Sequence, residues 1–168
     1  MINIDNLQGG NVHLMNVEYI NPFINVSVNL LQMVCNVNAK RGSIYIKNSP
    51  FTSESVAIII GVAGEFKGQV FFTMTESVAC KIASSMMMGR EVKLLDEMSK
   101  SAIAELGNMI MGNVSTEFFN SGIKIDITPP TVLVGKDMAI SIKGLRTICI
   151  PFELESMGKL EIDVSITE

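Results

Sequence analysis

Residues 158–167 read Gly-Lys-Leu-Glu-Ile-Asp-Val-Ser-Ile-Thr, which is the most regular β pattern in the chain. Apolar and polar residues alternate along this segment, and successive side chains of a strand point to opposite faces of a sheet. The pattern therefore predicts a strand with one apolar and one polar face. Because it is long, regular and free of proline, this strand would be prone to pair with another chain if it lay at a sheet edge.

Working back from this segment, further β patterns occupy both halves of the chain. The run at residues 55–62 is apolar throughout, which predicts a strand buried on both faces. Gly64 and Gly68 enclose the turn that joins it to the next strand. The expected strands lie at residues 44–47, 55–62, 69–74, 131–134, 138–143, 146–153 and 158–167.

Three segments follow helical periodicity instead. The first is expected to begin at Asn21-Pro22, with Asn21 as the N-cap and proline at the first helical position. The second is capped by Thr75 and ends near Gly89, and the third runs over residues 96–122. The order helix, strands, helix, helix, strands predicts an α+β fold with a largely antiparallel sheet, long helices and two pseudo-symmetric halves.

Length and composition indicate one ordered domain. The chain has 168 residues, of which 48% are hydrophobic and 18% charged. This composition provides a core and excludes a disordered chain. Residues 1–14 contain several Asn and Gly and show no periodicity. We therefore expect a flexible N-terminal extension at 1–14, followed by a domain at 15–168.

Several classes of partner are disfavoured by the same composition. The net charge of −4 argues against nucleic acid binding, which needs a surplus of Lys and Arg. No apolar run approaches the roughly 20 residues of a membrane span, and no secretion signal is present. The three cysteines are far apart, and a single histidine accompanies them, so we expect buried thiols and no metal site. The prediction is a cytoplasmic protein without membrane, nucleic acid or metal ligands.

The third helix carries a polar stripe. At about 100° per residue, its expected core arc contains Ala102, Ile103, Leu106, Met109, Ile110 and Val114, and also Asn113. The stripe opposite comprises Ser101, Glu105, Asn108, Gly112 and Ser115. Its Glu and Asn are neighbours one helical turn apart, and its glycine suggests close approach of another molecule. From spacing alone three interpretations stay open: an ordinary solvated face, a binding surface, or a catalytic pair.

The segment from Ser101 to Asn113 resembles the signature of the CheC/CheX/FliY chemotaxis phosphatases. That signature has Ser or Asp, three residues, Glu, two residues, Asn, and then a small residue, here Gly112. The resemblance extends from about residue 15 to the end and is strongest to the CheX branch, which keeps one such motif. A second candidate, Glu18 with Asn21, is rejected because Asn21 is expected to cap the first helix, so that Glu18 precedes it.

This resemblance implies a function. The substrate would be the phosphoaspartate of a CheY-like response regulator, and the catalytic residues would be Glu105 and Asn108. Asn108 would orient the attacking water, and Glu105 would hold the regulator's active-site lysine. Ser101 and Gly112 would support the motif or admit the partner. No cofactor of its own is expected, since Mg²⁺ would be bound by the partner receiver domain.

The resemblance also implies a homodimer formed by sheet-to-sheet association, with which the strand at residues 158–167 is compatible. The main alternative function is a non-catalytic adaptor of the chemotaxis or flagellar-switch machinery, in which the motif only docks a partner. A metal-dependent hydrolase using Glu105 is a weaker alternative, because few carboxylate or imidazole side chains lie at ligand spacing.

Overall fold

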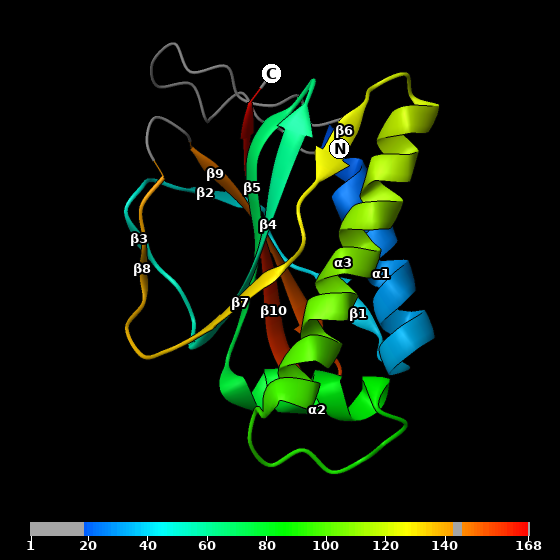
Figure 1. Cartoon of the computed structure of the whole chain (residues 1–168), viewed down its shortest axis with the longest axis vertical. Coiled ribbons are helices and arrows are strands. Elements are labelled where there is room, and N and C mark those ends of the chain that lie inside the picture. Colours follow the sequence, from blue (N-terminus) through cyan, green and yellow to red (C-terminus); the bar gives the residue numbers. More distant parts are fainter. Residues whose placement is uncertain (1–18, 143–145, 168) are drawn as a thin grey trace.

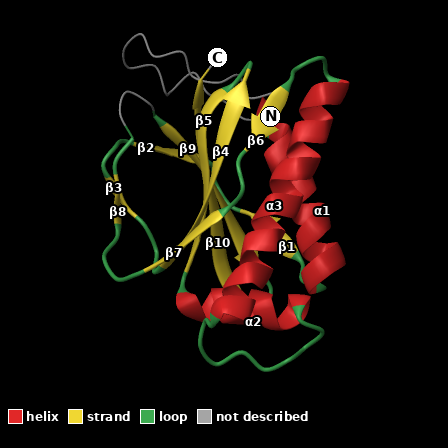
Figure 2. Ribbon diagram, in the orientation of Figure 1, coloured by secondary structure: helices red, strands yellow, loops and turns green. Residues whose placement is uncertain are grey.

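The computed structural model describes residues 19–142 and 146–167. The expected extension at residues 1–14 and the side chain of Glu18 lie outside these ranges. Within them, three helices cover one face of a central sheet, and a small two-stranded ribbon lies on its other side (Figures 1 and 2). The predicted α+β class with an antiparallel sheet is confirmed.

The main sheet has eight strands, and all of its pairings are antiparallel. Its continuous path runs β1-β9-β10-β5-β4-β6, while β2 pairs with β9 and β7 with β4. β3 and β8 form the separate ribbon. The strands are β1 (Ala39–Arg41), β2 (Tyr45–Lys47), β3 (Phe51–Thr52), β4 (Val56–Gly64), β5 (Lys67–Met74), β6 (Ile125–Ile127), β7 (Thr131–Val134), β8 (Ala139–Ile140), β9 (Thr147–Leu154) and β10 (Gly158–Thr167).

The closing strand β10 lies at the centre of the sheet. It pairs with β5 from Leu160 to Thr167 and with β9 from Gly158 to Val164. Its backbone groups are therefore bonded on both sides over most of its length, so the strand has no long open edge for pairing with another chain, and the homodimer stays a prediction. The open edges belong to the shorter strands instead.

The strand pairing has an approximate two-fold pattern. The first half of the chain supplies β1–β5 and the second half supplies β6–β10. β1 and β2 of the first half pair with β9 of the second, whereas β6 and β7 of the second half pair with β4 of the first. β5 pairs with β10 and β3 with β8. Exchanging the halves preserves every pairing, which agrees with the predicted pseudo-symmetry.

The helices are α1 (Asn21–Cys35), α2 (Glu76–Met86) and α3 (Glu97–Asn120). α1 and α3 lie side by side along the sheet, and α2 crosses below them (Figure 1). Asn21 is the first helical residue of α1 and Ile20 is its N-cap, without a side-chain cap, so the predicted cap at Asn21 is wrong. The predicted cap at Thr75 is confirmed, since its hydroxyl accepts from the Val78 amide; Asp96, predicted as the start of the third helix, is its N-cap and accepts from the Ser99 amide. Among the described residues, no helix combines the length and apolar character needed to cross a bilayer.

A cluster of charged side chains lies on the sheet face away from the helices, with Asp163 fully buried and Lys47 and Glu161 half-buried. Lys47 of β2 forms ion pairs with Glu161 and Asp163 of β10, and the Tyr45 hydroxyl donates to Glu161 at 2.5 Å. Asp163 is fully buried, and this burial raises the pKa of its carboxyl to about 6. Phe51 of the ribbon covers the cluster, with its ring centroid 5.1 Å from the Lys47 ammonium. The polar face predicted for this strand is therefore interior at Asp163 and Ser165, and it reaches the surface toward Lys159.

Candidate functional site

α3 is held against the sheet by a continuous apolar face. Ile103, Leu106, Ile110, Val114 and Phe118 are each at most 2% exposed and belong to the main core. The helix begins at Asp96, whose Oδ1 accepts from the Ser99 amide at 2.8 Å and from the Ser99 hydroxyl at 2.7 Å. These hydrogen bonds lower the pKa of the Asp96 carboxyl, so its charge is kept at the positive end of the helix dipole. The orientation of the outer face is thus fixed by packing and by a cap.

The predicted motif lies on this outer face. Glu105 is exposed on the side of α3 opposite its core residues, and Asn108 is half-buried at the flank of that outer face. One turn of helix separates them, a rise of about 4.5 Å. Within the described part of the chain, neither side chain makes a hydrogen bond or an ion pair. A carboxylate and an amide therefore stand next to each other without internal partners, able to bind one external molecule together.

The remaining stripe residues differ in their surroundings. The Ser101 hydroxyl donates to the Glu97 carbonyl at 2.8 Å, one turn back along α3. Ser115 donates to the Ile125 carbonyl at 3.1 Å and so ties α3 to β6. A methyl group placed at Gly112 would meet no atom within 4 Å, which means that the glycine is not required by the packing of this chain. Ser115 has an internal structural role, whereas Gly112 has none.

The core face of α3 is rotated from its expected position. Gly107 and Met111 are buried, although neither was in the expected arc. Asn113, which was placed in that arc, is exposed, and its amide donates to the Met109 carbonyl at 2.8 Å. The buried residues centre about 60° from the predicted direction on the helical wheel. This rotation turns Asn108 toward the neighbouring strands, which explains why it is half-buried while Glu105 is exposed.

Gly107, inside the motif, has a packing role that the sequence analysis missed. A methyl group there would lie 3.1 Å from Cγ2 of Ile58 and 3.4 Å from Cδ1 of Ile60, both on β4. The glycine thus lets α3 approach the sheet closely beneath the Glu–Asn pair. In the sequence, this role could have been recognised from a glycine that lies between Glu105 and Asn108 but falls outside the polar stripe.

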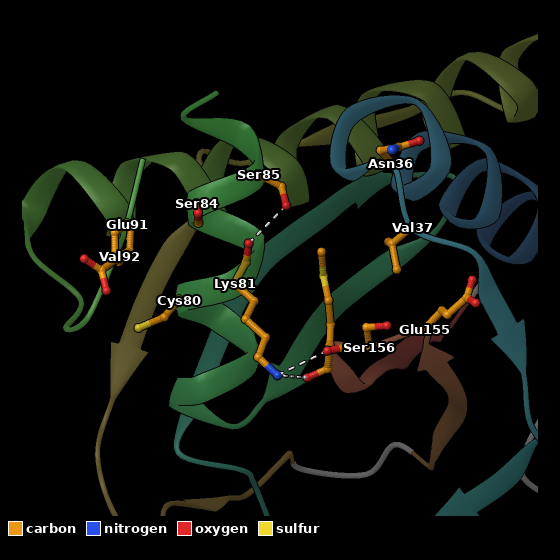
Figure 3. Close-up of a pocket in the computed structure, with 11 residues that line it drawn as sticks. Asn36, Val37, Cys80, Lys81, Ser84, Ser85, Glu91, Val92, Glu155 and Ser156 are labelled. Atoms are coloured by element: carbon orange, nitrogen blue, oxygen red, sulfur yellow. Dashed lines mark hydrogen bonds between the residues drawn. The ribbon is translucent and has the colours of Figure 1, made fainter. Parts of the chain in front are cut away.

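A prominent hollow of the surface lies elsewhere. It measures about 610 Å³ and lies between α2, the end of α1 and the β9–β10 turn (Figure 3). Lys81 spans it and donates to the carbonyls of Ser156 and Met157 at 3.3 and 3.2 Å. Neither Glu105 nor Asn108 lines this hollow. The motif is instead displayed on a convex helix, a shape suited to entering a pocket of another macromolecule and not to enclosing a small one.

One group of possible metal ligands was not foreseen. Cys149, Glu161 and Asp163 bring their ligand atoms within 4.8 Å of one another across β9 and β10. The Lys47 ammonium already contacts both carboxylates, so a cation occupies this position within the chain itself. Burial and the nearby Asp163 raise the pKa of the Cys149 thiol, which opposes formation of a thiolate ligand. The arrangement is that of a buried ion-pair cluster.

Comparison with protein families finds a match over more than half of the chain. The family described as "Chemotaxis phosphatase CheX" matches residues 56–153, a stretch that includes all of the outer face of α3 from Ser101 to Gly112. Among individual proteins, the chain is similar to the "CheY-P phosphatase CheX" of Thermotoga maritima. The two are 30% identical over 152 residues, which cover 90% of this chain and 97% of the other.

Solved structures with a similar fold agree with this family match. A CheC-like protein from Shewanella superposes with a TM-score of 0.82 at 28% identity, covering 92% of this chain and all of the other. CheX from Vibrio vulnificus superposes with a TM-score of 0.80 at 26% identity, covering 89% of this chain and 99% of the other. A chain of a CheX–CheY–BeF3–Mg²⁺ complex from Borrelia burgdorferi superposes with a TM-score of 0.77 at 30% identity, covering 91% of this chain and 100% of the other.

Proposed function

The chain belongs to the CheX family of chemotaxis phosphatases, and on this premise we propose that it hydrolyses the aspartyl phosphate of a CheY-like response regulator. The observation that carries the proposal is the pair of side chains on α3, Glu105 and Asn108, adjacent on a convex face and without partners among the residues that the structure describes. The Thermotoga relative is named a CheY-P phosphatase, and the Borrelia relative forms a complex with CheY, BeF3 and Mg²⁺.

In the proposed reaction, Asn108 orients a water molecule in line with the phosphorus. The water oxygen forms the new bond to phosphorus, and the bond from phosphorus to the aspartyl oxygen breaks. Free carboxylate and inorganic phosphate are released, and the water proton passes to the phosphate. Because Asn108 is half-buried, packing restricts its amide before the partner arrives, which lowers the cost of ordering the water.

Glu105 has the anchoring role. Its exposed carboxylate forms a charge-assisted hydrogen bond with the lysine of the regulator's active site and so holds α3 over the phosphorylated pocket. The Mg²⁺ that neutralises the phosphoryl group belongs to the receiver domain. Ser101 and Gly112 are secondary: the first stabilises the turn before Glu105, and the second leaves room for the partner's backbone.

We also place the protein in the cytoplasm as a homodimer. Its three cysteines are buried and free, which fits a reducing compartment. Because β10 is central, the dimer must use another part of the sheet. β7 is a candidate, since it pairs only with β4 and its Leu133 and Val134 are 43% and 44% exposed. A monomer in sedimentation at micromolar concentration would contradict this assembly.

The test of the proposed activity is the decay of a phosphorylated receiver domain mixed with a substoichiometric amount of this protein. Multiple turnovers are expected from the unaltered chain. Asn108→Ala and Glu105→Ala should each lower the rate by roughly 30- to 1,000-fold, as loss of one preorganised hydrogen-bonding group does. Both should leave the free energy of unfolding within about 0.5 kcal/mol, since neither side chain has a hydrogen-bond or ion-pair partner in the described part of the chain.

Two outcomes would contradict the proposal. Binding of the receiver without turnover would favour the adaptor function in place of catalysis. Full activity of Asn108→Ala would agree with phosphatase activity but would contradict the mechanism in which Asn108 orients the attacking water.

A further inference from the structure

The exposed stripe of α3 continues beyond the motif and ends in a large apolar side chain on each side. Met98 precedes Ser101 by three residues, and Phe119 follows Ser115 by four. Both positions fall within the same arc of about 100° as Glu105 and Asn108. Met98 is 56% exposed and Phe119 is 61% exposed. The polar pair is thus flanked by two apolar residues on one straight face.

The spacing of these residues along the helix is nearly symmetric. Met98 lies ten residues before Asn108 and Phe119 eleven residues after it, which corresponds to about 15 and 16.5 Å. A domain of 100–150 residues has a radius of gyration of about 13–15 Å. A partner of this size that received Asn108 at the centre of its contact surface would therefore reach both apolar residues at once.

Each apolar residue has surroundings suited to contact with a partner. At the first end, the Arg90 guanidinium approaches the Met98 sulfur at 3.4 Å, and Leu94 in the preceding loop is 75% exposed. At the second end, Phe119 borders a hollow of about 400 Å³ that Lys124 and Asp126 also line. An apolar side chain beside a polar-rimmed hollow resembles the centre of a protein interface more than an isolated exposed residue.

Single exposed apolar residues are common on protein surfaces and carry no meaning by themselves. Met33 on α1 is an example, since it is 72% exposed but lies off the α3 stripe. What distinguishes Met98 and Phe119 is their alignment with an unpaired polar pair on the same rigid helix. Continuity with the proposed site thus identifies the occupant as the same receiver domain.

We propose that Met98 and Phe119 are docking residues that select the receiver domain by apolar contacts on both sides of its phosphorylated pocket. This inference rests on the proposed function. It assigns recognition to the ends of the stripe and chemistry to its centre. The partner it predicts has apolar side chains about 15 Å to either side of the phosphoaspartate.

The test separates binding from chemistry. Rates of receiver dephosphorylation would be measured over a range of receiver concentrations for Met98→Ser, Phe119→Ser and the control Met33→Ser. The docking variants should raise KM by about 10- to 100-fold, the usual effect of removing an interface anchor, with kcat within about two-fold. Met33→Ser should leave both constants unchanged. Circular dichroism would verify that each variant is folded.

Other results would overturn the inference, and they differ from those that contradict the activity. If the unaltered protein turns over receiver but both docking variants keep its KM, the apolar ends do not contact the substrate. A fall in kcat at constant KM would likewise exclude a docking role. If the variants instead change from dimer to monomer in sedimentation, the apolar ends join copies of this chain. Absence of turnover in the unaltered protein would refute the proposed function itself.

Discussion

Two groups of polar side chains in this molecule have opposite environments. Glu105 and Asn108 lie on the outer side of α3 and have no partner within residues 19–142 and 146–167, whereas Lys47, packed against Phe51 of β3, pairs with both Glu161 and Asp163. A buried charge is tolerated only when it is paired, so the second group is expected to maintain the fold. An unpaired surface pair contributes little to folding and keeps its hydrogen-bonding capacity for another molecule. Burial and pairing together thus distinguish structural from functional polar residues here.

The largest effect should come from breaking the buried group. Lys47→Met removes the ammonium and leaves the buried carboxylate of Asp163 without its cation, beside the half-buried carboxylate of Glu161, which should lower the free energy of unfolding by about 3–5 kcal/mol. Activity per folded molecule should be unchanged. Urea unfolding and dephosphorylation rates measure the two quantities. Lys159→Met is a matched control on β10, because its pair with Glu153 is exposed and contributes less than about 1 kcal/mol.

A loss of activity in folded Lys47→Met would abolish the distinction between the two groups. A loss of stability in Asn108→Ala would abolish it equally, because this change is predicted to lower the dephosphorylation rate while leaving the free energy of unfolding nearly unchanged.

The pH dependence of stability gives a second test of the buried group. The folded-state pKa of Asp163 is raised to about 6, above the roughly 3.9 of an unfolded chain, so the native state holds this proton more tightly. Stability from this residue is present below about pH 4 and is lost as the pH rises through 6, by up to about 3 kcal/mol. Between pH 4 and 7 the unaltered protein should therefore lose stability relative to Asp163→Asn. Parallel unfolding free energies for the two proteins across this range would contradict the assignment.

The smallest effect should come from the two glycines of α3, which compare its inner and outer faces. Gly112→Ala adds a methyl group in open space and should stabilise the helix by about 0.5–1 kcal/mol. If Gly112 admits the partner's backbone, the same change lowers the dephosphorylation rate. Gly107→Ala is the control, because its methyl group meets Ile58 and should offset that gain by strain in the core. A variant of Gly112 with full activity would leave this glycine without a role in partner binding.

Much of the fold follows from patterns that the sequence carries locally. The periodicity of α3, its Asp96 cap and the glycines around the β4–β5 turn are all local features, and the predicted helices and long strands agree with the structure. β1, β3 and β6 were not predicted, since each has only two or three residues and, unlike the equally short β2 and β8, does not lie in a longer alternating segment. Their pairing depends on partners more than 60 residues away in the chain.

The errors at the site have a different origin. Alternation along residues 158–167 reveals two faces but not what covers each, so the burial of Asp163 and Ser165 could not be foreseen. The helical wheel of α3 located the polar stripe on the outer face but misplaced the centre of the buried face. Gly107, which packs against β4, and Met111, which lies in the main core, were not expected to be buried. Tertiary contacts decide such orientations. The roles of Glu105 and Asn108 came from the family motif, because helical spacing alone does not separate a catalytic pair from a solvated one.

The exchange of edge strands between the halves has a consequence for assembly of the chain. β1 and β2 complete the hairpin formed by β9 and β10, and β6 and β7 complete that formed by β4 and β5. The strands of each half therefore need strands of the other half to complete their backbone hydrogen bonding. The central pairing of β5 with β10 likewise forms only when segments distant in the sequence meet. Such non-local closure slows folding and makes unfolding a single cooperative event. A chain cut in the loop between α2 and α3 should yield two fragments that are unfolded apart and acquire structure only when mixed.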